Sequence, residues 1–115
     1  MTTEKRFDLE ERTTKYGIAI VEFCKKVQVN LVTQPIVIQL VRSGTSIGAN
    51  YREANGADSK RDFCAKISIC KKEAKETMYW LEVLETAVNT MTDNCKQLWK
   101  EAHELSLIFG AINRK

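Results

Sequence analysis

The sequence predicts an all-α protein whose four helices form an antiparallel bundle. Helix-favouring residues are frequent, whereas only one proline and five glycines occur in 115 residues. Apolar side chains recur at steps of three and four residues through four segments, the spacing that gives a helix one buried face. The connections between these segments are short, as in an up-down bundle. The chain is long enough for one domain with its own core, residues 1–115, and too short for two.

The first helix is expected to open at Asp8, which is suited to cap it, with Glu11 three residues later as in a capping box. Its apolar stripe fades near residue 28 and consists of Leu9, Tyr16, Ile20, Phe23 and Val27. Residues 27–33 alternate weakly between apolar and polar, but no second strand exists to pair with them. We therefore expect a loop there.

Pro35 is suited to the first turn of a second helix, where a missing N–H is tolerated. The stripe then runs through Ile36, Leu40, Ser43, Ile47, Asn50 and Ala54, and residues 55–58 (NGAD) end it. Gly44 and Gly48 lie four residues apart, so they share a helical face that another backbone can approach closely. A phosphate-binding loop is excluded, because it requires a lysine after the second glycine and a preceding strand.

Ser59, with Asp62 three residues later, is expected to cap a long third helix. Its stripe alternates steps of four and three residues and consists of Phe63, Ile67, Cys70, Ala74, Thr77, Leu81, Leu84 and Val88. This heptad-like seam indicates long, nearly parallel packing partners. Thr92 or Asp93 is expected to cap the fourth helix, whose stripe is Leu98, Ala102, Leu105, Phe109 and Ile112.

Several motifs resemble one known family. They are "RSGTSIGANYREA" from Arg42 to Ala54, then Ser59, Asp62, Phe63 and Lys66, and then "KEA.ET.YWL" from Lys72 to Leu81. Together with "DLEERT" and "KEAHEL", they resemble the 23S ribosomal RNA intervening-sequence proteins over about residues 6 to 112. The resemblance implies a left-handed up-down four-helix bundle that assembles as a ring, typically a homopentamer, with no established catalytic activity.

A related group, the accessory variability determinants of diversity-generating retroelements, is similar in fold and assembly. Its members are basic adaptors that bind a reverse transcriptase and nucleic acid. The present sequence departs from the usual pattern at residues 55–57 and in its extra cysteines, Cys64 and Cys70. The first departure puts the form of the turn after the second helix in doubt, and neither threatens the fold.

The third helix is divided by charge. Residues 60–75 carry six basic and two acidic side chains, whereas residues 76–93 carry four acidic side chains and no basic one. This order opposes the helix dipole, so helix stability does not explain it. At 100° per residue, five of the basic residues fall on one flank: Lys60, Arg61, Lys71, Lys72 and Lys75.

Two interpretations of this flank are open. It is either a solvated surface or a basic stripe that binds RNA or DNA phosphates. Arg42 and Arg52 are further candidates for the stripe. Arg52 is equally suited to an ordinary surface ion pair. The net charge of +3 is modest, but a five-membered ring would repeat the stripe five times.

The acidic half of the third helix carries a second apolar face opposite the seam, formed by Tyr79, Trp80, Val83 and Ala87. A single bundle buries only one face of each helix, so the second face predicts a contact with another subunit. Gly44 and Gly48 are further candidates for that contact. The alternative is that Trp80 packs on the end of the core or under the chain ends.

The sequence offers no catalytic or metal-binding pattern. His103 is the only histidine, three residues after a lysine, so the Glu-x-x-His motif of di-iron bundles is missing. Nothing in the spacing joins His103 to Ser43 or Ser46 as in a Ser-His-Asp arrangement. The cysteines at 24, 64, 70 and 95 form no C-x-x-C pair, so reduced thiols are expected. We expect no cofactor and no metal.

The N-terminus lacks the apolar region of a signal peptide, and no apolar run is long enough to cross a bilayer. A cytoplasmic protein without membrane contact is therefore expected, and the family resemblance implies a bacterial one. The leading hypothesis is a non-enzymatic, self-assembling module that binds nucleic acid electrostatically or acts as a scaffold. The alternative is an adaptor ring that recruits a protein partner without nucleic acid.

Overall fold

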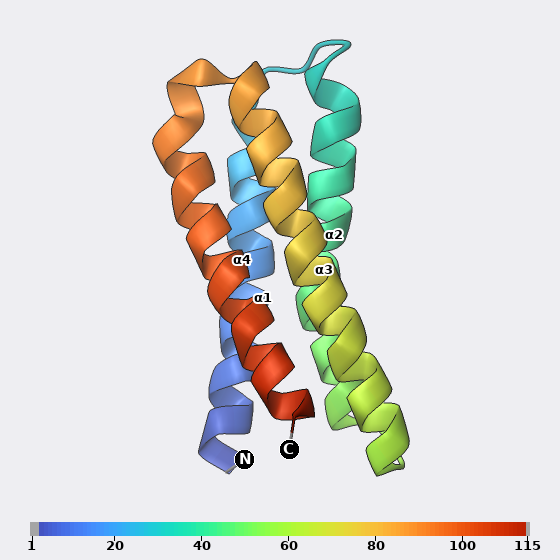
Figure 1. Cartoon of the computed structure of the whole chain (residues 1–115). Coiled ribbons are helices and arrows are strands. Elements are labelled where there is room, and N and C mark those ends of the chain that lie inside the picture. Colours follow the sequence, from blue (N-terminus) through green and yellow to red (C-terminus); the bar gives the residue numbers. More distant parts are fainter. Residues whose placement is uncertain (1–2, 115) are drawn as a thin grey trace.

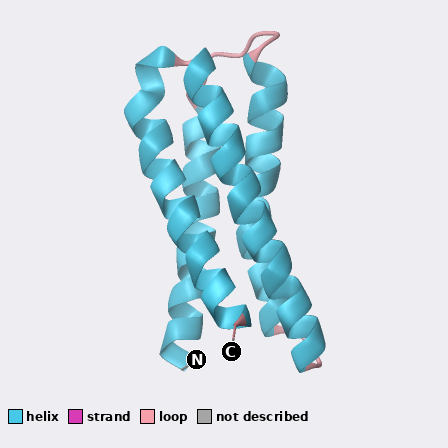
Figure 2. Ribbon diagram, in the orientation of Figure 1, coloured by secondary structure: helices cyan, strands magenta, loops and turns pink. Residues whose placement is uncertain are grey.

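Four long helices make up almost all of the chain in the computed structural model, which describes residues 3–114 (Figure 1). In order they are α1 (Thr3–Lys25), α2 (Thr33–Asn55), α3 (Lys60–Ala87), the short 3₁₀ helix η1 (Asn89–Met91) and α4 (Thr92–Asn113). No strand occurs in the described residues, as Figure 2 shows. The predicted all-α class and the four predicted helices are confirmed.

Consecutive helices run in opposite directions, and both chain ends lie at the same end of the molecule as the α2–α3 turn (Figure 1). The molecule measures 44 × 21 × 21 Å. The 28 residues of α3 rise ~42 Å at 1.5 Å each and span almost this whole length. Helix α2 packs closely against α1 and α3, and α3 packs closely against α4, whereas the backbones of α1 and α4 approach each other at few points.

The core lies along the shared axis of the four helices and receives one stripe of side chains from each. Its fully buried members include Ile20, Leu40, Ile47, Tyr51, Ile67, Leu81, Leu84, Leu105 and Phe109. Polar contacts also join α2 to α3 inside this core: the Thr77 hydroxyl lies 3.0 Å from the Ser43 hydroxyl, and the Cys70 thiol lies 3.6 Å from the Ile47 carbonyl oxygen. The predicted stripes therefore face inward, because the helical period places their residues on one side.

Two predicted helix starts are wrong. Helix α1 begins at Thr3 rather than at Asp8. Residues 4–7 include no proline or glycine that would interrupt the helix. At the start of α4 no side chain caps the backbone. Instead, η1 leads into the helix and the Thr92 hydroxyl donates back to the carbonyl of Asn89. The predicted Ser59 cap is confirmed, since its side chain accepts from the backbone N–H of Asp62.

The α1–α2 connection is a loop, as predicted, and side-chain hydrogen bonds order it. The Asn30 side chain accepts from the backbone N–H groups of Val32 and Thr33, each at 2.9 Å. The buried Thr33 hydroxyl donates to the carbonyl of Gln28 at 2.6 Å. This ordered loop nevertheless displays Val29, Leu31 and Val32 to solvent.

Candidate nucleic-acid interface

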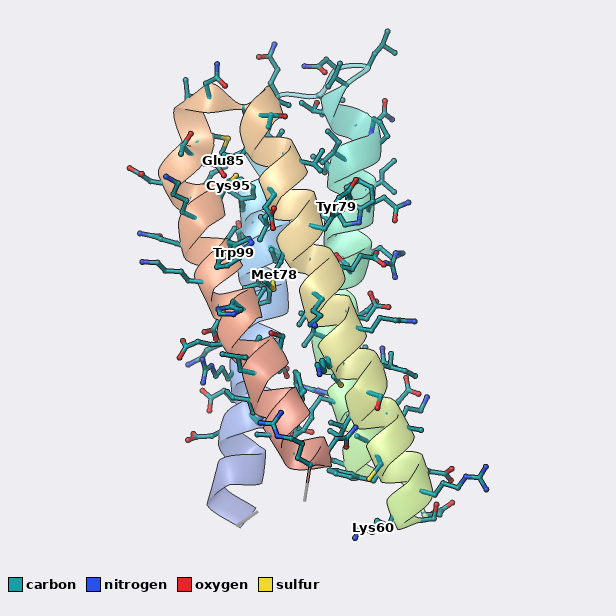
Figure 3. All side chains as sticks on the ribbon, viewed as in Figure 1. Lys60, Met78, Tyr79, Glu85, Cys95 and Trp99 are labelled. Carbon is teal, nitrogen blue, oxygen red and sulfur yellow. The ribbon has the colours of Figure 1, made fainter. Side chains whose placement is uncertain are left out.

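The basic residues of α3 gather on its N-terminal half, at the end of the bundle that holds the chain termini. We call Lys60, Arg61, Lys71, Lys72 and Lys75 the basic face. Figure 3 shows Lys60 and Glu85 at opposite ends of α3. Four members are exposed. Lys71 is half-buried and leans over α4, with its Nζ 3.5 Å from the point where a Cβ on Gly110 would stand.

No residue of the basic face forms a salt bridge within the part of the chain that the structure describes. Other cations of the protein do have carboxylate partners: Lys15 binds Glu11, and Lys66 binds Glu53 at 2.7 Å. Among the side chains that the structure describes, none therefore neutralises the positive charge of the basic face.

The two arginines that the sequence adds to this surface lie elsewhere. Arg42 on α2 binds the carboxylates of Glu73 and Glu76 on α3. Glu73 is buried, and a buried carboxylate is stable only beside a positive charge, which Arg42 supplies. Arg52 turns towards α1 and donates to the Thr14 hydroxyl at 3.2 Å. Neither side chain extends the basic face.

The predicted second apolar face lies on the C-terminal half of α3. Tyr79 is 56% exposed, Ala87 is exposed, and Trp80 and Val83 are half-buried. The Tyr79 and Trp80 rings meet edge to face at 4.9 Å, and Trp80 also packs against the core. The packing of Trp80 against the core agrees with the alternative interpretation, while the contact with another subunit stays a prediction.

An exposed apolar residue of α2 was not predicted from the sequence. Ile38 on α2 is 57% exposed. Because α2 and α3 are antiparallel and Ser43 meets Thr77, Ile38 stands level with the residues just after Trp80. We call Ile38, Tyr79, Trp80 and Val83 the apolar ridge. The signal that was available is the absence of any charged residue from position 27 to 41.

Gly44 and Gly48 face α1 of the same chain. A Cβ on Gly44 would stand 2.9 Å from Cγ1 of Ile20, and one on Gly48 would stand 3.2 Å from the carbonyl oxygen of Thr13. Both glycines are buried. The close approach expected from these small residues therefore occurs within the subunit, and their surface is not open to a second copy.

A groove between α1 and α4 was not predicted from the sequence. Its volume is about 1050 Å³, and its apolar lining consists of Leu9, Tyr16, Ala19, Phe23, Leu98 and Ile108. Charged residues, among them Lys15, Glu22 and Lys26, form its rim. The stripe of α1 resembles an ordinary core stripe, so its residues do not reveal that α4 stands away from it.

The candidate catalytic groups do not come together. His103 stacks on Trp99, with ring centroids 5.1 Å apart, while the Ser43 hydroxyl is buried between α2 and α3. The four cysteines are free thiols. Among the described residues no three histidine, cysteine or acidic side chains are placed to hold a metal ion. Within residues 3–114 no helix combines the length and hydropathy of a membrane span.

These four helices, with the basic half of α3 and the motif that packs α2 on α1, match a family model described as 23S rRNA-intervening sequence protein over residues 5–111. The chain belongs to this family. The resemblance of its motifs is thereby confirmed.

This member of the 23S rRNA-intervening sequence protein family is also similar to a solved structure. That crystal structure is of a protein of unknown function from the S23 ribosomal protein family of Bacteroides thetaiotaomicron. The two sequences are 32% identical, the TM-score is 0.81, and the match covers 93% of this chain and 99% of the other. No curated protein matches the chain.

Proposed function

We propose that this protein is a non-enzymatic, ring-forming module that binds RNA or DNA through the basic face of α3. The observation that carries the proposal is that, among the described side chains, no carboxylate pairs with the exposed members of that face, Lys60, Arg61, Lys72 and Lys75. Unpaired lysines and arginines on one helix face match the spaced negative charges of a nucleic-acid backbone.

Local helix energetics do not require these cations. Positive charge near a helix N-terminus opposes the macrodipole, and the start of α3 is already stabilised by the Ser59 cap and by Asp62 in its first turn. The arrangement therefore lowers helix stability slightly, and ligand binding would offset this loss.

The expected binding is electrostatic and weakly selective for sequence. The exposed aromatic side chain nearest to the basic face, Tyr79, lies one helical turn beyond Lys75 and is not interleaved with the cations. Stacking on bases is therefore a minor contribution, and phosphate contacts dominate. A homopentameric ring, which the family resemblance implies, would present five copies of the basic face and raise a weak affinity through multivalency.

Fluorescence anisotropy of a short labelled RNA and its DNA equivalent, at several salt concentrations, tests this function. Each phosphate contact should contribute a log–log salt slope of about −0.7 to −0.9. The double variant Lys72→Glu, Lys75→Glu should bind more weakly and with a smaller slope. Both side chains are exposed, so the fold should be unaffected.

Lys96→Glu with Lys100→Glu is the matched control, because it makes the same charge change on exposed residues of α4. The proposal requires the control to retain most of the affinity. Equal losses in the two double variants would show a general charge effect, and unchanged binding by the α3 variant would remove the basic face from consideration.

The adaptor function is the second candidate, and the ordered loop after α1 favours it. Leu31 is 94% exposed there beside Val29 and Val32, on a backbone that Asn30 and Thr33 hold in place. Purification from nuclease-treated extract would recover one stoichiometric protein if this loop binds a partner. Leu31→Ser should then abolish the recovery.

Free cysteines suit a reducing compartment, so we propose a cytoplasmic location for either function.

A further inference from the structure

Two cations approach one glycine near the end of α4. Lys71 reaches over from α3, and its Nζ lies 3.5 Å from the point where a Cβ on Gly110 would stand. The Nη1 nitrogen of Arg114, at the end of α4 itself, lies 3.6 Å from the same point. Gly110 has no side chain to separate them. Two positive charges from different helices therefore converge at the α3–α4 junction.

Neither of these cations has an acidic partner among residues 3–114. Arg12 and Arg42, by contrast, each bind two carboxylates. Like charges at short range repel each other, and water screens this repulsion less where a side chain is half-buried, as Lys71 is. An anion held by both groups would remove the repulsion.

The end of a helix offers a simpler explanation that does not fit. The last turn of a helix attracts cations, and long basic side chains there donate hydrogen bonds to its open carbonyls. Within the described chain, neither the Lys71 ammonium nor the Arg114 guanidinium forms such a hydrogen bond. The helix end thus favours positive charge in this place but does not explain why both groups turn to one point.

The junction is held in place by contacts that need no ligand. The Asn113 side-chain amide donates to the Cys64 carbonyl at 3.0 Å and to the Ser68 hydroxyl at 2.8 Å. These bonds fix the end of α4 on α3 beside Arg114. Ser68 is exposed and precedes Lys71 by three residues, so the two share a face of α3. Its oxygen accepts from Asn113, which leaves its own proton available to an anion.

We propose that Lys71, Arg114 and the Ser68 hydroxyl form a binding site for one phosphate group at the α3–α4 junction. A guanidinium presents parallel N–H groups to two phosphate oxygens, and a lysine adds a mobile point charge. This inference rests on the proposed function, because Lys71 belongs to the basic face. It adds two residues outside that face, Ser68 and Arg114, and converts one part of a diffuse surface into a defined site.

The phosphate can come from three sources with the same chemistry: the 5′ end of a strand, its backbone, or the free ion. A terminal phosphate monoester carries up to two negative charges, whereas each backbone diester carries one. The two cations match the charge of a monoester. The experiment therefore compares the same RNA with a 5′-phosphate and with a 5′-hydroxyl.

Two variants block the site in different ways. Gly110→Asp places a carboxylate where the cations converge, so the chain itself occupies the site. Gly110→Asn is its matched control, because it has nearly the same size and no charge. No atom lies closer than 3.5 Å to the added Cβ, so both side chains can start from this position without a clash. Arg114→Gln removes one cation at an exposed position, and Lys100→Gln makes the same charge change at an exposed residue of α4 outside the site.

Fluorescence anisotropy at several salt concentrations measures the effect. Gly110→Asp and Arg114→Gln should each bind RNA about tenfold more weakly, the loss of one charge-assisted contact. The log–log salt slope should fall by about 0.7, which corresponds to one phosphate. Gly110→Asn and Lys100→Gln should bind as wild type does. A loss confined to the 5′-phosphorylated RNA identifies the terminal phosphate, and an equal loss with both RNAs identifies the backbone.

Several results would overturn the site while the proposed function stands. Wild-type affinity in Arg114→Gln is one of them, and an equal loss in Lys100→Gln is another. Arg114→Gln decides the question if circular dichroism shows that Gly110→Asp does not fold.

A wild type that binds no RNA would refute the proposed function, and inorganic phosphate then tests the site alone. Phosphate should raise the melting temperature of the wild type at constant ionic strength, because a ligand of the folded state stabilises it. Arg114→Gln should lose this shift. An equal shift in both proteins, or none in the wild type, would overturn the site.

Discussion

Arg12 on α1 and Glu101 on α4 form a two-pronged ion pair across the groove, with both nitrogen–oxygen distances at 2.7 Å. One turn away, the Tyr16 hydroxyl donates to the Leu98 carbonyl. These side chains connect two helices whose backbones otherwise diverge. The hydrogen bonds that Arg12 donates to Glu101 are the main cause that raises the pKa of Arg12, so this guanidinium stays charged at all ordinary pH values.

Removing the charge of Glu101 should loosen the α1–α4 edge. We expect Glu101→Gln to lower the free energy of unfolding by about 1 kcal/mol, since the pair is bidentate but about one-third of each side chain is exposed and screened by solvent. Urea unfolding measures the change, which should shrink at high salt. Glu11→Gln removes only the exposed Lys15–Glu11 pair and should change stability by less than about 0.5 kcal/mol. Equal effects would mean that the cross-groove pair has no special role.

The contact between Gly44 and Ile20 should make Gly44→Ala destabilising. Alanine favours a helix over glycine by about 1 kcal/mol, but its Cβ would stand within 3.2 Å of three atoms of the fully buried Ile20. Overpacking of this kind lowers stability by about 1–3 kcal/mol, so we expect a net loss of about 1 kcal/mol. The double variant with Ile20→Val should recover part of it.

Gly56→Ala is the control for this substitution. Its nearest neighbours are 3.7 Å from the added Cβ, and its φ of −96° suits any residue. It should leave the melting temperature unchanged or raise it slightly. A stabilised Gly44→Ala would show that α1 and α2 can separate at this level at little cost.

The four thiols should differ in reactivity. Burial raises the pKa of Cys24 and Cys95 to about 11 and that of Cys70 to about 12, whereas Cys64 is half-buried. A thiol reagent added to native protein at pH 8 should therefore label Cys64 rapidly and the other three only after unfolding. Cys64→Ser should abolish the rapid phase. Rapid labelling of that variant would indicate that the bundle opens locally.

Stability should fall in alkaline solution. The Cys70 thiol is neutral in the folded chain up to about pH 12, but in the unfolded chain it loses its proton from about pH 9. Unfolding then releases protons, so the contribution of this thiol is complete below pH 9 and is lost progressively as pH rises towards 12. Cys70→Ala should be less stable than wild type at pH 8, and the gap should narrow by pH 11. A constant gap would contradict the raised pKa.

The cap of α3 should matter more than the polar residues at the start of α4. Ser59→Ala removes the acceptor for the Asp62 N–H and should lower stability by about 1 kcal/mol. Thr92→Ala should have a smaller effect, because Thr92 does not cap its helix. Thermal unfolding of the two variants distinguishes them, and similar losses would argue against the cap.

The sequence by itself determined which segments are helical and which side of each helix is buried. Both are local properties: a helix repeats every 3.6 residues, so a stripe such as that from Ile67 to Leu84 appears in the residue order before any partner is known. The Ser59 cap was predictable for the same reason, since acceptor and donor lie three residues apart.

Only the tertiary structure decided what each face meets. The glycine face of α2 contacts α1, Arg42 forms a salt bridge with the buried Glu73, and the separation of α4 from α1 leaves a groove. These outcomes depend on the angles and distances between whole helices, which many weak contacts along ~40 Å set together. A residue pattern shows that a face is apolar. The space between two helices depends on how they pack, so the sequence of either helix alone does not determine it.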